Sequence, residues 1–333
     1  MITFTHQDER ITLQTGQTWT ARPAEKPYRD TAADELREIV SQVRAGSPWR
    51  TVIAQHYETK NPWLHRIVAS RSRDLFFRQY PPKPDARILD VGAGWGQIAL
   101  PLANAGHRVT ALEPTPERLA FIEAAAKQDG AAERMHFLQA DLFEIEFETR
   151  FDLVCCIGVL EWVPKFRAGD PRTVQIDFLK KLRSSLTPGG QLVIGIENRL
   201  GLKYLLGAND DHIGVPDVAV YDAKFATEKW QRRTGKDLRS FTYTEAEVTE
   251  LLTTAGFTAS TFHAALPDYK LPEAIFPLAE ANRHFATAVH IPEHDGSNGE
   301  PMTNQAELAS HYRSLAQQKV AATFVPSFFV TAS

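Results

Sequence analysis

The chain has 333 residues, 43% hydrophobic and 23% charged, an ordinary composition for one large domain or a core with additions. Its formal net charge of −4 disfavours a broad basic surface, so we expect no nucleic-acid substrate. No apolar run approaches the length of a bilayer span and the first residues lack a signal-peptide pattern, so we expect no membrane insertion.

The first part of the chain is predicted to be mostly helical. Residues 1–30 alternate weakly, which predicts a short hairpin or an arm. From Thr31 apolar residues recur at spacings of three and four, and the last of the helical stretches runs from about Trp63 to Phe77. Prolines at positions 81, 82 and 84 then end any helix. Residues 1–80 are therefore an N-terminal extension, either a lid over a substrate pocket or plain scaffold.

Beyond the prolines, short apolar strands alternate with helical stretches. Strands are predicted at Arg87–Val91, Arg108–Leu112, Met135–Gln139, Phe151–Ile157 and Gln191–Ile196, and helices at Gln97–Ala105, Pro116–Lys127 and Val174–Ser185. Such alternation implies parallel pairing with right-handed crossovers. The predicted fold is α/β, a Rossmann-like doubly wound sheet.

The last third of the chain departs from this rhythm. Residues 199–240 are rich in polar and aromatic groups and are read as a segment inserted on the substrate side of a domain spanning residues 81–333. A helix is predicted at Thr244–Ala255, and two further strands are predicted at Thr258–His263 and Thr323–Val330. With these strands the sheet is expected to be mostly parallel with an antiparallel C-terminal strand. Residues 295–299 are expected to be a loop.

The sequence contains two cysteines, Cys155 and Cys156, which are adjacent. Neighbours on a strand point to opposite faces, so they suit neither a disulfide with each other nor a zinc site. A reducing compartment fits this usage, and we expect a cytoplasmic protein.

The strongest local motif is Asp90-Val91-Gly92-Ala93-Gly94-Trp95-Gly96, between a predicted strand and a predicted helix. Its glycines permit a tight turn and close approach of a ligand to the main chain. Free N–H groups at the start of the following helix favour an anionic group. The strand–loop–helix context makes this a nucleotide-type binding motif.

Two acidic residues refine the kind of ligand. Glu113 closes the second strand, where a carboxylate can accept both hydroxyls of a ribose. Asp141 follows the third strand, where a carboxylate can accept from an adenine amino group, although a turn or helix N-cap is the alternative role.

With these residues in place, positions 86–200 resemble the core of the class I S-adenosylmethionine-dependent methyltransferases. Five stretches match the family's motifs in order, namely Ile88–Gly96, Ala111–Pro114, Gln139–Asp141, Phe151–Val163 and Leu182–Glu197. The resemblance implies an enzyme that uses S-adenosyl-L-methionine as its methyl donor.

The resemblance also implies roles for individual residues. The glycine loop would border the methionine part of the cofactor, Asp90 would reach its amino group, and the remaining residues would contact ribose, adenine or the methyl donor. The cofactor-binding residues expected on this basis are Asp90, Gly92, Gly94, Gly96, Glu113, Asp141, Leu142, Ile157, Gly158 and Glu161. Trp162 stands where many relatives carry a histidine, so no base is expected at that position.

The sequence narrows the class of methyl acceptor by the motifs that it lacks. The fourth strand ends without the Asn/Asp-Pro-Pro-aromatic run of DNA amino methyltransferases, and no cysteine lies in a Pro-Cys loop. We expect a small molecule or glycan, methylated on a hydroxyl. A less specific resemblance, carried by residues 197–212 and 267–272, is to bacterial methyltransferases of polysaccharide assembly.

A hydroxyl acceptor calls for a general base. His212, with Asp210 or Asp211 as the orienting partner, is the candidate; a solvated loop with local capping bonds is the alternative. Glu197 could be imagined as a metal ligand, but no matching carboxylate set is apparent in the sequence, so no metal is expected.

Four other functions stay open. A nicotinamide-dependent oxidoreductase would need Gly-x-Gly-x-x-Gly, and Gly96 comes one residue too early for it. An N-methyltransferase of a small metabolite, a non-catalytic cofactor-binding subunit and an aminopropyl transferase share the fold, and the intact cofactor motifs disfavour the non-catalytic subunit.

Overall fold

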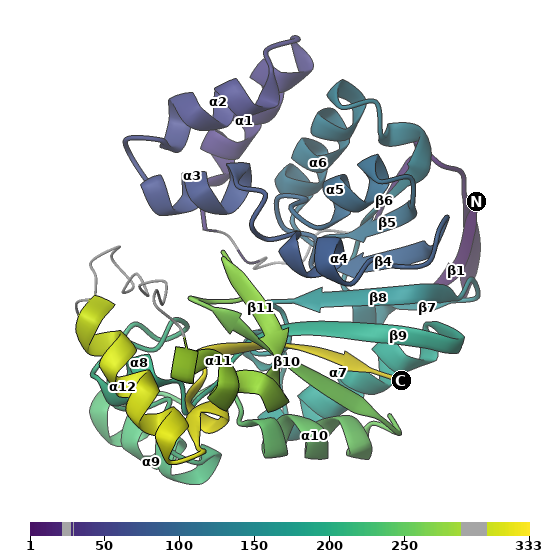
Figure 1. The fold of residues 1–333 in the computed structure, drawn as a ribbon. Coiled ribbons are helices and arrows are strands. Elements are labelled where there is room, and N and C mark those ends of the chain that lie inside the picture. Colours follow the sequence, from purple (N-terminus) through teal and green to yellow (C-terminus); the bar gives the residue numbers. More distant parts are fainter. Residues whose placement is uncertain (22–27, 29, 288–304) are drawn as a thin grey trace. The chain divides into compact units, whose positions relative to one another are not determined.

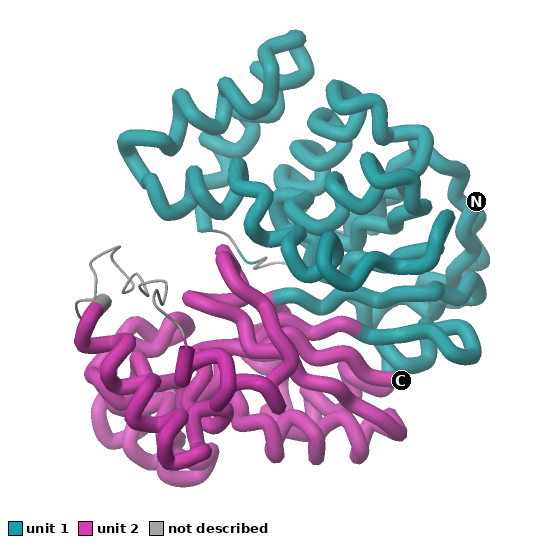
Figure 2. The backbone as a smooth tube through the Cα atoms, viewed as in Figure 1, with its two compact units in different colours: residues 1–157, 181–192 teal, residues 158–180, 193–333 magenta. Residues whose placement is uncertain are grey.

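The computed structural model describes residues 1–21, 28, 30–287 and 305–333. The chain divides into two compact units (Figure 2). Unit 1 consists of Met1–Ile157 with Lys181–Leu192, and unit 2 of Gly158–Lys180 with Val193–Ser333. These units cut across the segments 1–80 and 81–333, whose status as domains stays a prediction.

A parallel sheet forms the centre of unit 1 (Figure 1). Its strand order is β9-β8-β4-β5-β6-β3, and the pairs β4–β5, β4–β8, β5–β6 and β3–β6 are all parallel. The bounds are β3 Thr18–Thr20, β4 Arg87–Val91, β5 Arg108–Leu112, β6 Met135–Gln139, β8 Phe151–Ile157 and β9 Leu186–Glu197. Strand β9 continues from unit 1 into unit 2 after Leu192. The predicted doubly wound α/β fold is confirmed, and the carboxyl ends of its parallel strands share one edge.

The first twenty residues are strands rather than helices. Strands β1 (Ile2–His6) and β2 (Glu9–Leu13) form the predicted hairpin, and β1 also pairs with β7 (Ile145–Phe147). Strand β3 then joins the main sheet beside β6. The N-terminal region is therefore helical only from Ala33 onward.

Helices cover the rest of unit 1. They are α1 Ala33–Arg44, α2 Trp49–Tyr57, α3 Pro62–Ala69, α4 Leu75–Gln79, α5 Ala99–Asn104 and α6 Pro116–Gln128, with 3-10 turns η1 Ala132–Arg134 and η2 Leu142–Glu144. The single helix predicted for 63–77 is wrong. Helix α3 ends before Ser70, whose backbone is extended. The Ser70 hydroxyl accepts a hydrogen bond from the Ser72 N–H, and the new helix α4 begins at Leu75.

The sheet in unit 2 has the order β11-β10-β12-β9. Strands β10 (Ser260–Leu266), β11 (Ala274–Pro277) and β12 (Ser327–Ala332) pair antiparallel, which confirms the predicted antiparallel C-terminal strand. The helices are α7 Pro171–Ser184, which continues into unit 1, α8 Leu202–Leu205, α9 Ala223–Thr234, α10 Glu245–Thr254, α11 Ala281–Thr287 and α12 Gln305–Gln317, with 3-10 turns η3 Val163–Phe166, η4 Leu278–Glu280 and η5 Ala321–Phe324.

The segment 199–240 is more ordered than an irregular insertion. It contains α8 and α9 and has its own small apolar cluster of Val218, Ala226 and Leu238. Its first residue, Arg199, forms an ion pair with Glu247 at 2.7 Å in the capping box of α10. The predicted loop at 295–299 lies outside the described residues. Among the helices that the structure describes, none has the length and apolar character of a membrane span.

Candidate cofactor site and a buried ionic cluster

In unit 1 the glycine loop turns directly off the end of β4. Gly92 and Gly94 have φ angles of 68° and 58°, in the left-handed region that favours glycine. The backbone N–H groups of Gly92 and Ala93 both donate to the carbonyl of Leu112, at 2.8 and 3.1 Å. The loop is thus fastened to the last residue of β5.

Glu113, the residue after β5, holds the loop from its other side. Its Oε2 accepts from the Gly94 N–H at 2.8 Å, and its Oε1 accepts from the Thr115 N–H at 2.9 Å. The side chain is buried. Since a carboxylate offers about four acceptor positions, these two bonds leave capacity for the hydroxyls of a ribose.

Asp90 is the least satisfied polar residue of this loop. The residue is only 2% exposed, and its Oδ2 has no hydrogen-bond partner among the described residues. Burial raises the pKa of its carboxyl to about 7, against the opposing charge of Arg73 and a hydrogen bond from the Ala99 backbone. An open, buried carboxylate oxygen of this kind fits a cationic amino group.

Gly96 has a packing role that the sequence did not reveal. Its φ is +83°, and a Cβ there would lie 3.0 Å from Leu100 Cδ1 and 3.2 Å from Ile122 Cγ1. The start of α5 thus packs closely on α6. This contact alone explains a glycine, so the cofactor role of Gly96 stays a prediction.

Asp141 adopts the turn role that was its alternative. Its Oδ1 accepts from the Phe143 N–H at 2.9 Å and caps the turn η2, which contains the buried Leu142. The Lys181 ammonium donates to the carbonyls of Leu142 and Phe143, at 3.1 and 3.0 Å, and steadies the same turn. Contact of Asp141 or Leu142 with an adenine stays a prediction.

The three residues expected at the end of the fourth strand belong to different units. Ile157 ends β8 in unit 1, and its carbonyl accepts from Arg73 at 3.4 Å. Gly158 begins unit 2 with a φ of +70°, and a Cβ there would approach the Tyr269 hydroxyl to 2.6 Å. That hydroxyl donates to the fully buried Glu161 at 3.0 Å.

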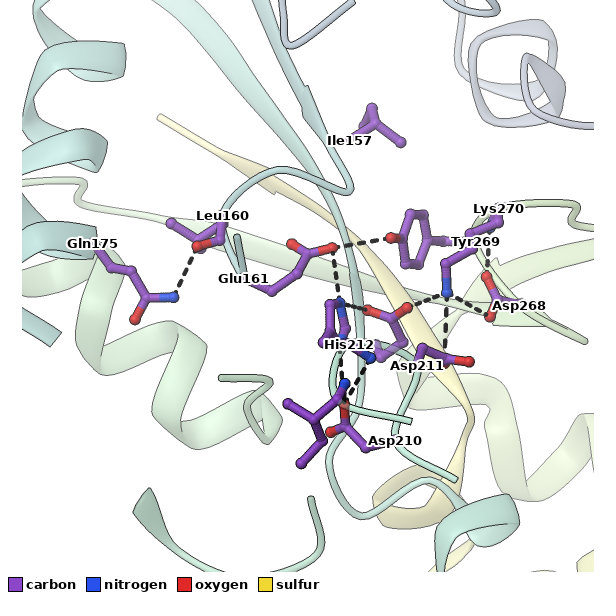
Figure 3. A network of polar contacts seen from close by, with 12 residues as sticks. Ile157, Leu160, Glu161, Gln175, Asp210, Asp211, His212, Asp268, Tyr269 and Lys270 are labelled. Atoms are coloured by element: carbon purple, nitrogen blue, oxygen red, sulfur yellow. Dashed lines mark hydrogen bonds and ion pairs between the residues drawn. The ribbon is translucent and has the colours of Figure 1, made fainter. Parts of the chain in front are cut away.

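Unit 2 contains a buried group of charged side chains, which we call the ionic cluster (Figure 3). Its members come from segments far apart in the chain and are joined by ion pairs. They are Glu161, Glu197, Lys203, Asp210, Asp211, His212, Asp268 and Lys270. Five carboxylates thus face two ammonium groups and one imidazole.

His212 lies within this cluster with carboxylates on both sides of its ring. Its Nε2 is 3.6 Å from Glu161 Oε1 and 3.6 Å from Glu197 Oε2, and its Nδ1 is 3.5 Å from Asp210 Oδ1. Burial would lower the pKa of His212, but these carboxylates outweigh it and raise the pKa well above 6.5. The side chain is 2% exposed, and an edge-to-face contact with Trp162 closes one side of the ring.

Of the two candidate partners, Asp210 is the one whose carboxylate lies beside the His212 ring. Asp210 Oδ1 faces the ring and also accepts from the His212 backbone N–H at 2.7 Å. The carboxylate of Asp211 instead accepts from Lys203 Nζ at 2.6 Å and from the Tyr204 hydroxyl at 3.0 Å. The two adjacent carboxylates therefore have different partners, which spacing alone did not show.

Sequence reasoning named Glu161, Glu197, Asp210, Asp211 and His212 for separate roles but did not predict that they form one cluster. Lys203 and Lys270 are buried or half-buried and paired with carboxylates, and Glu197 is fully buried at the end of β9. Buried charges need partners, so a charged residue at the end of an apolar strand was the one available signal.

Comparison with known proteins agrees with the loop geometry. Residues 89–194 match the family model described as a methyltransferase domain. A ubiquinone biosynthesis O-methyltransferase of Rickettsia felis is 32% identical over 147 residues, which cover 43% of this chain and 56% of that protein. A tRNA 5-carboxymethoxyuridine methyltransferase of Escherichia coli is 30% identical over 166 residues, covering 48% and 60%. The chain therefore spans less than two thirds of the length of these relatives.

Among solved structures, the chain is similar to the CcbJ methyltransferase of Streptomyces caelestis. The identity is 18%, the coverage is 61% of this chain and 84% of that one, and the TM-score is 0.44. This similarity is too distant to bear on the acceptor.

Residues 89–194 match a methyltransferase domain, and the parallel sheet and the glycine loop agree with the class I S-adenosylmethionine-dependent fold. Domains of this class use S-adenosyl-L-methionine as cofactor, as the sequence motifs predicted.

Proposed function

We propose that this chain is an S-adenosylmethionine-dependent methyltransferase that methylates a hydroxyl group of a small-molecule or glycan acceptor. The observation that carries the cofactor part is Asp90, whose buried Oδ2 has no hydrogen-bond partner among the described residues. It lies at the end of β4, in the loop that the family match covers. A cationic amino group is the ligand that such an oxygen favours.

In this proposal the contacts to the amino group, the ribose and the adenine come from the carboxyl edge of the unit 1 sheet. Asp90 accepts from the amino group, the Gly92–Gly96 loop borders the methionine part, and Glu113 accepts from the ribose hydroxyls. Asp141 and Leu142 contact the adenine, and Ile157, Gly158 and Glu161 follow the end of β8. When bound, S-adenosylmethionine supplies a methyl group on a sulfonium, already activated for in-line displacement.

The hydroxyl acceptor is supported by the ionic cluster of unit 2. A hydroxyl must lose its proton as it is methylated, and the protein needs a group to receive that proton. Glu161, which the family resemblance puts beside the methyl donor, belongs to this cluster together with His212. Both ring nitrogens of His212 face carboxylates, so we assign the proton to the His212 cluster as a whole and not to a free imidazole.

Two further observations agree with a small acceptor in the cytoplasm. The formal net charge of −4 offers no excess of basic residues for a nucleic acid. Cys155 and Cys156 are both free and buried, as expected where thiols stay reduced. One relative acts in ubiquinone biosynthesis as an O-methyltransferase, which matches the reaction type.

The test is transfer of labelled methyl groups from S-adenosylmethionine by the purified full chain. It would be offered a panel of glycans and small hydroxyl compounds, their amine analogues, and bulk tRNA. We expect label in an acceptor hydroxyl and a loss of transfer in His212→Ala at saturating acceptor. Label only in amines or in tRNA would refute the acceptor class, and near-normal turnover of His212→Ala would refute the role of the cluster.

A further inference from the structure

Three ligand-type atoms converge inside the ionic cluster of unit 2. His212 Nε2 lies 3.6 Å from Glu161 Oε1 and 3.6 Å from Glu197 Oε2. Ligand atoms of all three residues lie within 4.8 Å of one another. At 3.6 Å the imidazole and the carboxylates are too far apart for direct hydrogen bonds. Figure 3 shows Glu161 and His212, from different segments of the chain, pointing toward one another.

This spacing matches a coordinated metal ion. Zinc and similar divalent ions bind imidazole nitrogen and carboxylate oxygen at about 2.0–2.2 Å, which separates neighbouring ligands by about 3.3–3.6 Å in tetrahedral geometry. The distances from His212 to the two carboxylates lie at the upper end of that range.

A second trio in the same cluster serves as an internal comparison. Glu197, Asp211 and Asp268 also converge within 4.8 Å, but ammonium groups already neutralise them. Lys270 Nζ contacts Glu197 Oε1 and lies 3.5 Å from Asp211 and 3.4 Å from Asp268. Lys203 Nζ adds a contact of 2.6 Å to Asp211. The protein supplies its own cations to this trio.

The first trio has unsatisfied oxygens instead. Glu161 Oε2 and Glu197 Oε2 have no hydrogen-bond partner among the described residues, and both side chains are fully buried. Burying a carboxylate oxygen without a partner is strongly unfavourable, and paired charges or metal coordination are the usual remedies. These two oxygens are the second observation, independent of the clustering, that points to a ligand.

We propose that Glu161, Glu197 and His212 bind a divalent metal ion. One imidazole with two carboxylates is a donor set that suits Mn²⁺, Fe²⁺ or Zn²⁺, with water in the remaining positions. Asp210, whose Oδ1 lies 3.5 Å from His212 Nδ1, orients the ring so that Nε2 faces the ion. The sequence predicted no metal because its ligands lie at positions 161, 197 and 212, with no spacing motif.

The metal site stands independently of the proposed function. If the metal site and the proposed function are both correct, the ion is what enables the ionic cluster to deprotonate the acceptor hydroxyl. A hydroxyl coordinated to a divalent ion has a lowered pKa, and its proton passes to bulk water or to a carboxylate of the cluster. Deprotonation of the hydroxyl would then need no free imidazole base.

The test is metal binding by the full chain without cofactor or acceptor. Protein treated with chelator is desalted and titrated with MnCl₂, and bound Mn²⁺ is measured by electron paramagnetic resonance. The proposal expects about one equivalent bound and a nitrogen coupling from one imidazole. Zn²⁺ should compete for the same equivalent. No binding of either ion up to millimolar concentration would overturn the proposal, whatever the variants do.

Two matched variants distinguish the trios. Glu161→Gln alters only the first trio and should weaken Mn²⁺ binding at least about tenfold, whereas Asp268→Asn alters only the second and should change it less than about threefold. The reverse pattern would place the ion in the second trio and overturn the assignment. His212→Asn should abolish the nitrogen coupling even if some binding remains. Circular dichroism of each variant verifies the fold, and binding of S-adenosylhomocysteine by the wild-type chain separates failure of the metal site from failure of the cofactor site.

Discussion

Glu113 Oε2 is hydrogen-bonded to the Gly94 N–H at 2.8 Å, so the residue that follows β5 also fixes the glycine loop that follows β4. The second oxygen of the same carboxylate accepts from Thr115 N–H at the start of α6. One carboxylate therefore joins the loop after β4 to the start of α6 at the proposed cofactor site.

Replacing Glu113 by alanine should both loosen the loop and remove the ribose contact. Each lost charge-assisted hydrogen bond contributes about 1.5–3 kcal/mol, so the Kd for S-adenosylhomocysteine should rise at least about tenfold in calorimetry. Glu117→Ala is the matched control, because its carboxylate pairs with Arg37 on α1. Equal affinity in Glu113→Ala and wild type would remove Glu113 from the cofactor site.

Affinity for S-adenosylhomocysteine should depend on pH through Asp90. Its carboxyl pKa is raised to about 7, so below that pH the unliganded protein holds a neutral carboxyl that must lose its proton to pair with the ligand's amino group. Affinity should fall as the pH drops from 8 to 6, by up to about tenfold per unit, with proton release on binding. Asp90→Asn should bind weakly and without this dependence. A flat profile for wild type across the same range would contradict the pairing.

Gly96→Ala should destabilise unit 1 more than an equally strained glycine elsewhere. A methyl group at Gly96 meets Leu100 and Ile122 at 3.0–3.2 Å with φ at +83°, whereas Gly130 has φ +72° and open space around it. We expect Gly96→Ala to lower the free energy of unfolding by about 1–3 kcal/mol more than Gly130→Ala. The measurement is urea denaturation followed by circular dichroism, and equal losses would show that packing is not the reason for this glycine.

The strands around the cofactor site were predictable residue by residue. Strands β4, β5, β6 and β8 begin and end where the apolar runs do, because each run is buried and is bounded by polar or turn residues. Strand β9 was underestimated, since Pro188, Gly189 and Gly190 lie within it and not in a turn before it. The local Pro-Gly-Gly sequence predicts a turn at this position, but the strand pairing within the sheet overrides that preference.

The ionic cluster was far less predictable. His212 was singled out from its residue type, yet its partners Glu161 and Glu197 lie 51 and 15 positions earlier in the chain. Only the tertiary fold brings them together, because no helix or strand period links such positions. The glycine loop, by contrast, is a local motif whose ligands follow one another in sequence.

Lys203 should be important for the stability of unit 2. Its side chain is 4% exposed and its Nζ is 2.6 Å from Asp211, whose carboxylate is 16% exposed, so Lys203→Met leaves a largely buried carboxylate without that cation. We expect a loss of about 3–5 kcal/mol in the free energy of unfolding. Lys229→Met, which removes an ion pair with the exposed Asp217, should leave stability nearly unchanged. Similar losses of unfolding free energy in both variants would contradict a stabilising role of the ionic cluster.

The central claim, that the unit 1 loop binds S-adenosylmethionine, is tested most directly by calorimetric titration of the full chain with S-adenosylhomocysteine, with NADH as the control ligand. The account predicts a single site for S-adenosylhomocysteine, weakened in Asp90→Asn and Glu113→Ala, and no heat from NADH. Binding of NADH, or no binding of S-adenosylhomocysteine by correctly folded protein, would contradict it and return the glycine loop to a general nucleotide-binding feature.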